Sequence, residues 1–164
     1  MHHSQRSFAL CLSLACTAVF AQNGSDYGYE YFNTVGRVIG EAKAIPWTAE
    51  ICSEAFPSEK PAIETALAAW RQRNREANLT LDSQFDVIQT YWNSLPGNRG
   101  HQTKQQMVDQ LNSQQPALKK SLESGEPANF KRVCSVYAEA LQSKRMDIEV
   151  KWPSQMAVIR RGPR

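Results

Sequence analysis

The sequence is poor in the side chains from which most metal, haem and nucleophilic sites are built. It holds three histidines and four cysteines in 164 residues, and His101 is the one histidine beyond position 3. It has no CxxC, CxxCH or GxSxG pattern and no glycine-rich phosphate-binding loop. We therefore expect no metal, no cofactor and no catalytic residues of these familiar kinds.

The sequence also has no large excess of charge of either sign. Lys and Arg number 19 against 16 Asp and Glu, which gives a formal net charge of +3 at pH 7. A protein that binds nucleic acid concentrates far more positive charge on one face, because its affinity comes largely from phosphate contacts. Nucleic acid is therefore not expected as the main partner.

Long apolar runs are limited to one, between Phe8 and Phe20. As a helix this run would be about 20 Å long, too short for a hydrocarbon core of about 30 Å. It follows Arg6 and ends at the small Ala21, a pattern typical of a secretory signal peptide. The sequence predicts cleavage after Ala21, a periplasmic or secreted protein, and no integral membrane span. The alternative is a lipoprotein cut before Cys16.

Two cysteines, Cys52 and Cys134, remain once residues 1–21 are removed. In an oxidising compartment, an even pair with no other evident use is most simply one structural disulfide. The bond would join the early part of the chain to its last long helix.

Apolar residues that recur at steps of three or four predict an all-helical bundle of about five helices within one domain, residues 22–152. The first helix should start near Tyr29 and end at Pro46, and Pro116 should interrupt the fourth helix. Residues 153–164 are expected to form a flexible basic tail. The predicted core anchors are the large aromatic residues of the helical stripes: Trp70, Phe85, Trp92, Phe130 and Tyr137.

Capping residues predict where the other helices begin. Ser58 suits the N-cap of a second helix, and Thr80 or Asp82 suits that of a third. Pro127 suits the first turn of the last long helix.

A short stretch near the end of the chain departs from the helical pattern. Apolar and charged side chains alternate from Met146 to Trp152, which is the period of a β-strand. An isolated strand leaves backbone donors and acceptors open, so a partner chain could complete it. The alternatives are an internal two-stranded ribbon or an extended arm packed on the helices. Ile148 and Trp152 are therefore candidate partner contacts.

A second candidate contact is the basic segment AWRQRNR, residues 69–75. On a helix, Arg71 and Arg75 stand one turn apart, and neither has an acidic side chain three or four residues away. Like charges at that spacing repel by about 0.2–0.5 kcal/mol unless a group from outside the helix pairs with them. The pair indicates either a surface for an anion or an acidic partner, or a solvated basic face.

Together these features predict a non-catalytic exported protein that binds a protein partner in the cell envelope, as an inhibitor, immunity or adaptor protein. In size, helical class and single disulfide, the chain is similar to acid-stress chaperones of the bacterial periplasm and to immunity proteins that neutralise cell-wall-degrading toxins. The first similarity implies an alternative function as a periplasmic stress chaperone. A further alternative is a hydrolase that acts on cell-wall polymers.

Overall fold

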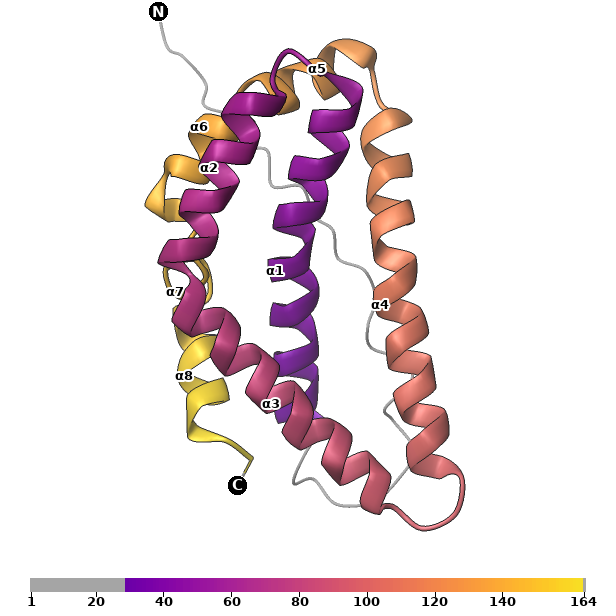
Figure 1. The fold of residues 1–164 in the computed structure, drawn as a ribbon. Coiled ribbons are helices and arrows are strands. Elements are labelled where there is room, and N and C mark those ends of the chain that lie inside the picture. The colour runs from indigo at the N-terminus through magenta and orange to yellow at the C-terminus, as the bar shows by residue number, and fades with distance from the viewer. Residues whose placement is uncertain (1–28, 164) are drawn as a thin grey trace, which may run out of the picture.

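Helix α1, Tyr29–Ala55, occupies the centre of the fold (Figure 1). The structure is a computed structural model that describes residues 29–163. The elements that follow α1 are α2 (Lys60–Arg73), α3 (Arg75–Ser94), α4 (Arg99–Glu123), α5 (Pro127–Ser135), α6 (Tyr137–Gln142), the 3-10 turn η1 (Lys144–Met146), α7 (Ile148–Lys151) and α8 (Pro153–Arg161).

The other helices are arranged around α1. α2 and α3 run along one side of it and meet at an angle, and α4 returns along the other side (Figure 1). α5 links the end of α4 to α6, and the chain then follows α2 and α3 down to α8. α8 packs on both α1 and α3, so the last helix lies against the first.

The core is formed mainly by the inward faces of α1, α2, α3 and the segment from α5 to α8. Burial of these faces is the main stabilising term, at about 25 cal/mol per Å² of apolar surface removed from water. The largest side chains with less than 2 % exposure are Ile63, Ile88, Leu141, Ile148, Met156, Ile159, Val35 and Val38.

The predicted helical class is confirmed: the described residues are all-helical and contain no strand. They form eight α-helices, more than the bundle of about five that we expected. The strand or extended arm predicted over residues 146–152 is wrong, because this segment forms the end of η1 and then α7. Ile148 and Trp152 are four residues apart, a spacing that fits a helix face as well as a strand face. Val150, between them, is exposed, as a helix requires.

Both predicted proline breaks are wrong. Pro46 lies inside α1 and Pro116 lies inside α4. A proline within a helix costs about 3 kcal/mol, because it removes one hydrogen bond and crowds the preceding turn. Around Pro46 this cost is offset by packing, since Ile45 and Ala49 are both buried in the core.

Two helix starts also differ from prediction. α2 begins at Lys60 with Glu59 rather than Ser58 at the N-cap. α3 begins at Arg75, well before Thr80. The break that separates α2 from α3 is at Asn74, whose backbone leaves the helical region with φ −99° and ψ 12°.

The segment after residue 152 is not a flexible tail. Pro153 opens helix α8, which continues to Arg161. Met156 and Ile159 of α8 are fully buried in the core. The helical spacing of these two residues gives α8 an apolar face, which packs against α1 and α3.

The predicted core anchors all contribute to the core, to different extents. Trp70, Trp92 and Tyr137 are buried. Phe85 and Phe130 are half-buried and pack against the core from its edge.

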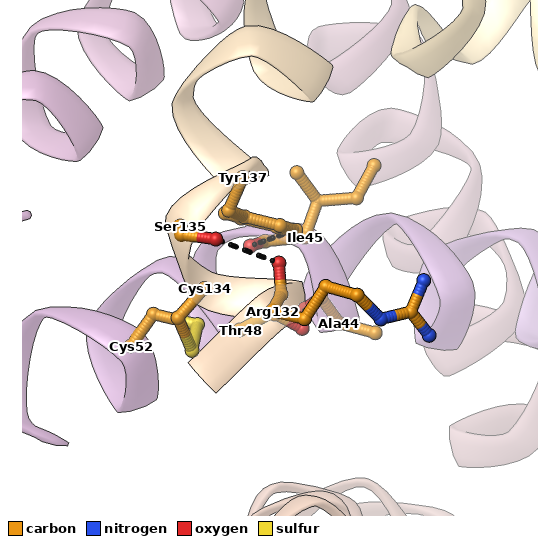
Figure 2. The surroundings of a disulfide bond; sticks show 8 residues. All are labelled: Ala44, Ile45, Thr48, Cys52, Arg132, Cys134, Ser135 and Tyr137. Atoms are coloured by element: carbon orange, nitrogen blue, oxygen red, sulfur yellow. Dashed lines mark hydrogen bonds between the residues drawn. A yellow bond between two sulfur atoms is a disulfide. The ribbon is translucent and has the colours of Figure 1, made fainter. Parts of the chain in front are cut away.

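The predicted disulfide between Cys52 and Cys134 is present and joins α1 to α5 (Figure 2). Both cysteines are buried, with 0 % and 1 % exposure. Beside them, the Tyr137 hydroxyl donates a hydrogen bond to the Ile45 carbonyl oxygen at 2.9 Å. Burial raises the pKa of Tyr137 well above its usual value, which keeps this hydroxyl protonated as a donor.

We expect the double variant C52S/C134S to fold with markedly reduced stability. The bond closes a sequence separation of 82 residues. For such a loop the chain-entropy model gives about 4.5 kcal/mol, and measured effects are typically about 2–4 kcal/mol. Urea denaturation followed by circular dichroism measures the loss in free energy of unfolding. Reduced wild-type protein is the control and should match the double variant. A midpoint equal to that of the oxidised protein would contradict a stabilising role for the bond.

Candidate functional site

Arg71 and Arg75, the predicted basic contacts, are both exposed. Neither forms a hydrogen bond or ion pair with any residue between 29 and 163. Arg73 behaves differently, since its guanidinium donates to the Leu141 carbonyl oxygen at 2.7 Å and pairs with Asp147 at 3.1 Å. The basic segment therefore contains one structural arginine and two unpaired ones.

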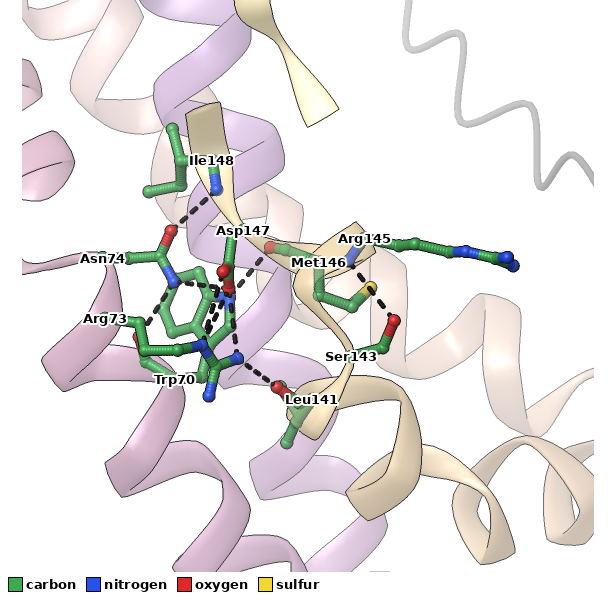
Figure 3. A network of polar contacts seen from close by, with 9 residues as sticks. All are labelled: Trp70, Arg73, Asn74, Leu141, Ser143, Arg145, Met146, Asp147 and Ile148. Carbon is green, nitrogen blue, oxygen red and sulfur yellow. Dashed lines mark hydrogen bonds and ion pairs between the residues drawn. The ribbon is translucent and has the colours of Figure 1, made fainter. Parts of the chain in front are cut away.

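Asn74 is a buried polar residue, 2 % exposed, at the break between α2 and α3 (Figure 3). Its Nδ2 donates to the Trp70 carbonyl oxygen at 2.9 Å and to Asp147 Oδ1 at 3.0 Å. Its Oδ1 accepts a hydrogen bond from the Ile148 backbone N–H at 2.7 Å. The amide is thus fully used in fastening the start of α7 to the α2–α3 break.

The Trp70 indole strengthens the same attachment. Its Nε1 donates to the Met146 carbonyl oxygen at 2.8 Å (Figure 3). With the contacts of Arg73 and Asn74, the end of α2 therefore holds the chain at four points, Leu141, Met146, Asp147 and Ile148. This network is structural, because its polar groups are used within the fold.

Ile148 and Trp152 are not partner contacts. Ile148 is 0 % exposed and Trp152 is 6 % exposed, and both belong to the core. The Trp152 indole nitrogen donates to the Glu41 carboxylate of α1 at 2.7 Å. The apolar side of the predicted strand is thus covered by the chain's own helices.

A small groove lies between α1 and α4. Its cavity volume is about 20 Å³, room for roughly one water molecule. The apolar lining comes from Phe32 and Gly36 on α1 and from Met107 and Leu111 on α4. The polar lining residues are Asn33, Arg37, Gln110 and Gln114.

The lower part of this α1–α4 groove is framed by aromatic rings. Phe32 lies 5.2 Å from the ring of Tyr91 and 6.3 Å from that of Trp92, centroid to centroid. On the neighbouring turn, the Tyr31 hydroxyl donates to Gln84 of α3, and burial raises the pKa of Tyr31. These contacts fix the α1 side of the groove against α3.

The α4 side of the groove is held less firmly. The buried residues of this 25-residue helix are Gly100, Met107 and Leu118. Gly36 permits the approach of Met107, because a Cβ at that position would lie 3.1 Å from the Met107 methyl carbon. A methionine side chain is flexible and fills irregular space without fixing one arrangement.

Further up, α4 is joined to α1 by exposed polar contacts. Gln115 donates to Glu50 at 2.9 Å, and Lys119 pairs with Glu54 at 3.0 Å. The hydrogen bond to Glu54 is the main cause of the raised pKa of Lys119. Exposed pairs of this kind stabilise a fold little. Of the long helices, α4 has the smallest share of buried residues, although it packs against both α1 and α3.

The lining of the groove suits apolar contacts and hydrogen bonding. Its lining combines an apolar floor with side-chain amides and one guanidinium. Arg37 at its rim is exposed and makes no hydrogen bond or ion pair with the described residues. Sequence reasoning missed Arg37, although the pair Gly36 and Gly40 one turn apart is a signal of close helix packing at this place.

Residues 29–163 contain no group of three or more His, Cys, Asp or Glu side chains placed to hold a metal ion. Within the same range, no helix combines the length and apolar character needed to cross a membrane.

Comparison with known proteins identifies no relative. No protein-family model matches the chain. No curated protein and no solved structure matches it either.

We predict that Asn74→Ala destabilises the fold by about 1–3 kcal/mol, because it leaves the buried Ile148 N–H without an acceptor. The matched control is Asn93→Ala, an exposed position on α3 at which the change should stay within about 0.5 kcal/mol. Urea titration of both variants measures the difference. Equal stability of the two variants would contradict the role of Asn74 as the fastening point.

Proposed function

We propose that this chain is an exported, non-catalytic helical protein that binds a protein partner in the cell envelope. The observation that supports this most is the α1–α4 groove, which combines an apolar floor with an unpaired arginine at its rim. The partner would be one whose activity or location is controlled by binding, as for an inhibitor, an immunity protein or an adaptor.

The groove fits a protein segment better than a small molecule. At about 20 Å³ its cavity is far below the roughly 300–1,000 Å³ of small-molecule sites. Two nearly parallel helices instead offer a line of apolar contacts, the arrangement that receives an amphipathic helix. The flexible Met107 and the small number of buried residues in α4 would allow the groove to widen around such a segment.

The positive charge of Arg37 at the rim of the groove indicates which chemical groups the partner would place there. Arg37 lines the groove together with Phe32 and Leu111 and forms no ion pair with the described residues. A partner with an apolar side chain next to a carboxylate would fill the floor and pair with this guanidinium. The glutamine and asparagine amides of the rim would satisfy polar groups of the partner backbone.

The proposed location is the periplasm or the cell exterior. The Cys52–Cys134 disulfide supports an oxidising compartment, where such bonds persist. The signal peptide and its cleavage after Ala21 lie outside the described residues and stay predictions from the sequence.

We predict that Arg37→Glu weakens partner binding by about tenfold or more, because it places a negative charge opposite the partner's carboxylate. Tagged wild-type protein, this variant and Lys43→Glu are used to capture proteins from the envelope fraction of the source cells. The captured partner is then titrated by calorimetry.

Lys43→Glu is the matched control, since it reverses one exposed charge on the same helix away from the groove. Wild type and this control should bind alike. Equal binding of all three proteins would contradict the groove as the site. Capture of no stoichiometric partner would contradict the proposed function itself.

A further inference from the structure

One flank of α2 and α3 carries four exposed charges that the fold leaves unpaired. They are Arg71, Arg75, Asp82 and Asp86. None of them forms a side-chain hydrogen bond or an ion pair with any other residue in the range 29–163. The two arginines are four residues apart across the break at Asn74, and the two aspartates are one turn apart on α3, so each pair brings like charges close together.

These charges lie along one flank of a continuous helical surface. The buried stripe of α2 and α3 contains Trp70, Asn74, Ala77 and Leu81, and it keeps its helical register across the break at Asn74. At 3.6 residues per turn, the four charged residues lie together, away from that stripe. The order of charge along the flank is two positive residues followed by two negative ones.

Next to this flank, the outer face of α3 carries one exposed charge, Glu76 in its first turn, and is uncharged beyond it. Its residues after the first turn include Leu79, Ser83, Val87 and Thr90, all exposed. Leu79 and Val87 are 53 % and 42 % exposed, so two large apolar side chains stand in solvent on this face. The Thr90 hydroxyl donates to the Asp86 backbone carbonyl oxygen. Removing water from such a face costs little.

We propose that this surface pairs with the same surface of a second copy of the chain, in antiparallel orientation about a two-fold axis. If the axis passes between residues 78 and 79, Arg75 of each copy lies at the level of Asp82 of the other. With the same axis, Arg71 of each copy lies at the level of Asp86 of the other. With this one placement, each of the four charged residues in one copy lies opposite a residue of opposite charge in the other copy.

The same placement puts an apolar contact at the centre. Leu79 lies within one residue of the axis, so it meets its own symmetry copy. This self-complementarity is what a two-fold interface requires, because the same patch must serve both subunits.

The bend between α2 and α3 limits the size of the contact. The two helices turn around α1 at Asn74 (Figure 1), so their outer surface is convex and the two α3 helices touch near their first three turns. Arg71 lies beyond the bend and reaches Asp86 through its long side chain. An interface built on one helix pair is below the usual area of about 800 Å² per partner, so we expect a dimer that dissociates at micromolar concentration.

A charge-exchange experiment tests this pairing. The variant R71D/R75D has four acidic residues on the flank, and D82R/D86R has four basic ones. Each should be monomeric by sedimentation at concentrations where wild type forms a dimer. An equimolar mixture should form a heterodimer, because every opposing pair is then of opposite charge.

Both variants keep like charges one turn apart at exposed positions, so their folded stability should be close to that of wild type, and circular dichroism checks this.

As a second measurement, Leu79→Cys should form an intermolecular disulfide under mild oxidation. Val150→Cys, similarly exposed, is the control and should not. A wild type that stays monomeric at millimolar concentration, or a mixture that does not associate, would overturn the proposal.

Discussion

The side chain of Asn74 is the interaction on which much of the architecture depends. It occupies the point where α2 ends and α3 begins, and its amide bonds both to α2 and to the chain at Asp147 and Ile148. Because it fastens these segments, it helps to set the direction of α3 and the position of α7. α8 follows directly and covers α1. A polar group buried this deeply specifies one arrangement, since every alternative would leave it unsatisfied.

The disulfide fastens the opposite end of the molecule. Cys52 near the end of α1 is joined to Cys134 of α5, so the last third of the chain is held to α1 by the disulfide and to the α2–α3 break by Asn74. α4 lies between these fixed parts with few buried residues of its own. The fold therefore combines a body held by these two attachments with one long helix that buries few residues, and the proposed partner groove lies at their boundary.

The sequence predicted what depends on local periodicity and on composition. The helical class follows from apolar spacing, and the disulfide follows from an even pair of cysteines that remains once the predicted signal peptide is removed. Prediction from the sequence failed where one residue spacing suits two kinds of secondary structure. The spacing of Ile148 and Trp152 fits a strand and a helix equally well. It failed again at Pro46, where packing of neighbouring residues outweighs the local cost of proline.

For the candidate surfaces too, the sequence predicted the local features and not those that depend on packing between distant residues. The exposure of Arg71 and Arg75 followed from helical spacing alone. The pairing of Arg73 with Asp147 joins residues 74 positions apart, and no local pattern encodes it. The α1–α4 groove is equally non-local, because Arg37 and Met107 meet through the packing of two helices.

The most direct measurement is amide hydrogen exchange of the isolated protein, resolved along the chain. If α4 is the weakly attached helix beside the groove, amides of residues 102–114 should exchange through local opening. The amides of residues 102–114 should exchange much faster than the amides of α1 around Cys52, because exchange around Cys52 should require global unfolding. Exchange of α4 and α1 at the same slow rate, as one cooperative unit, would contradict a groove that can widen to receive a partner.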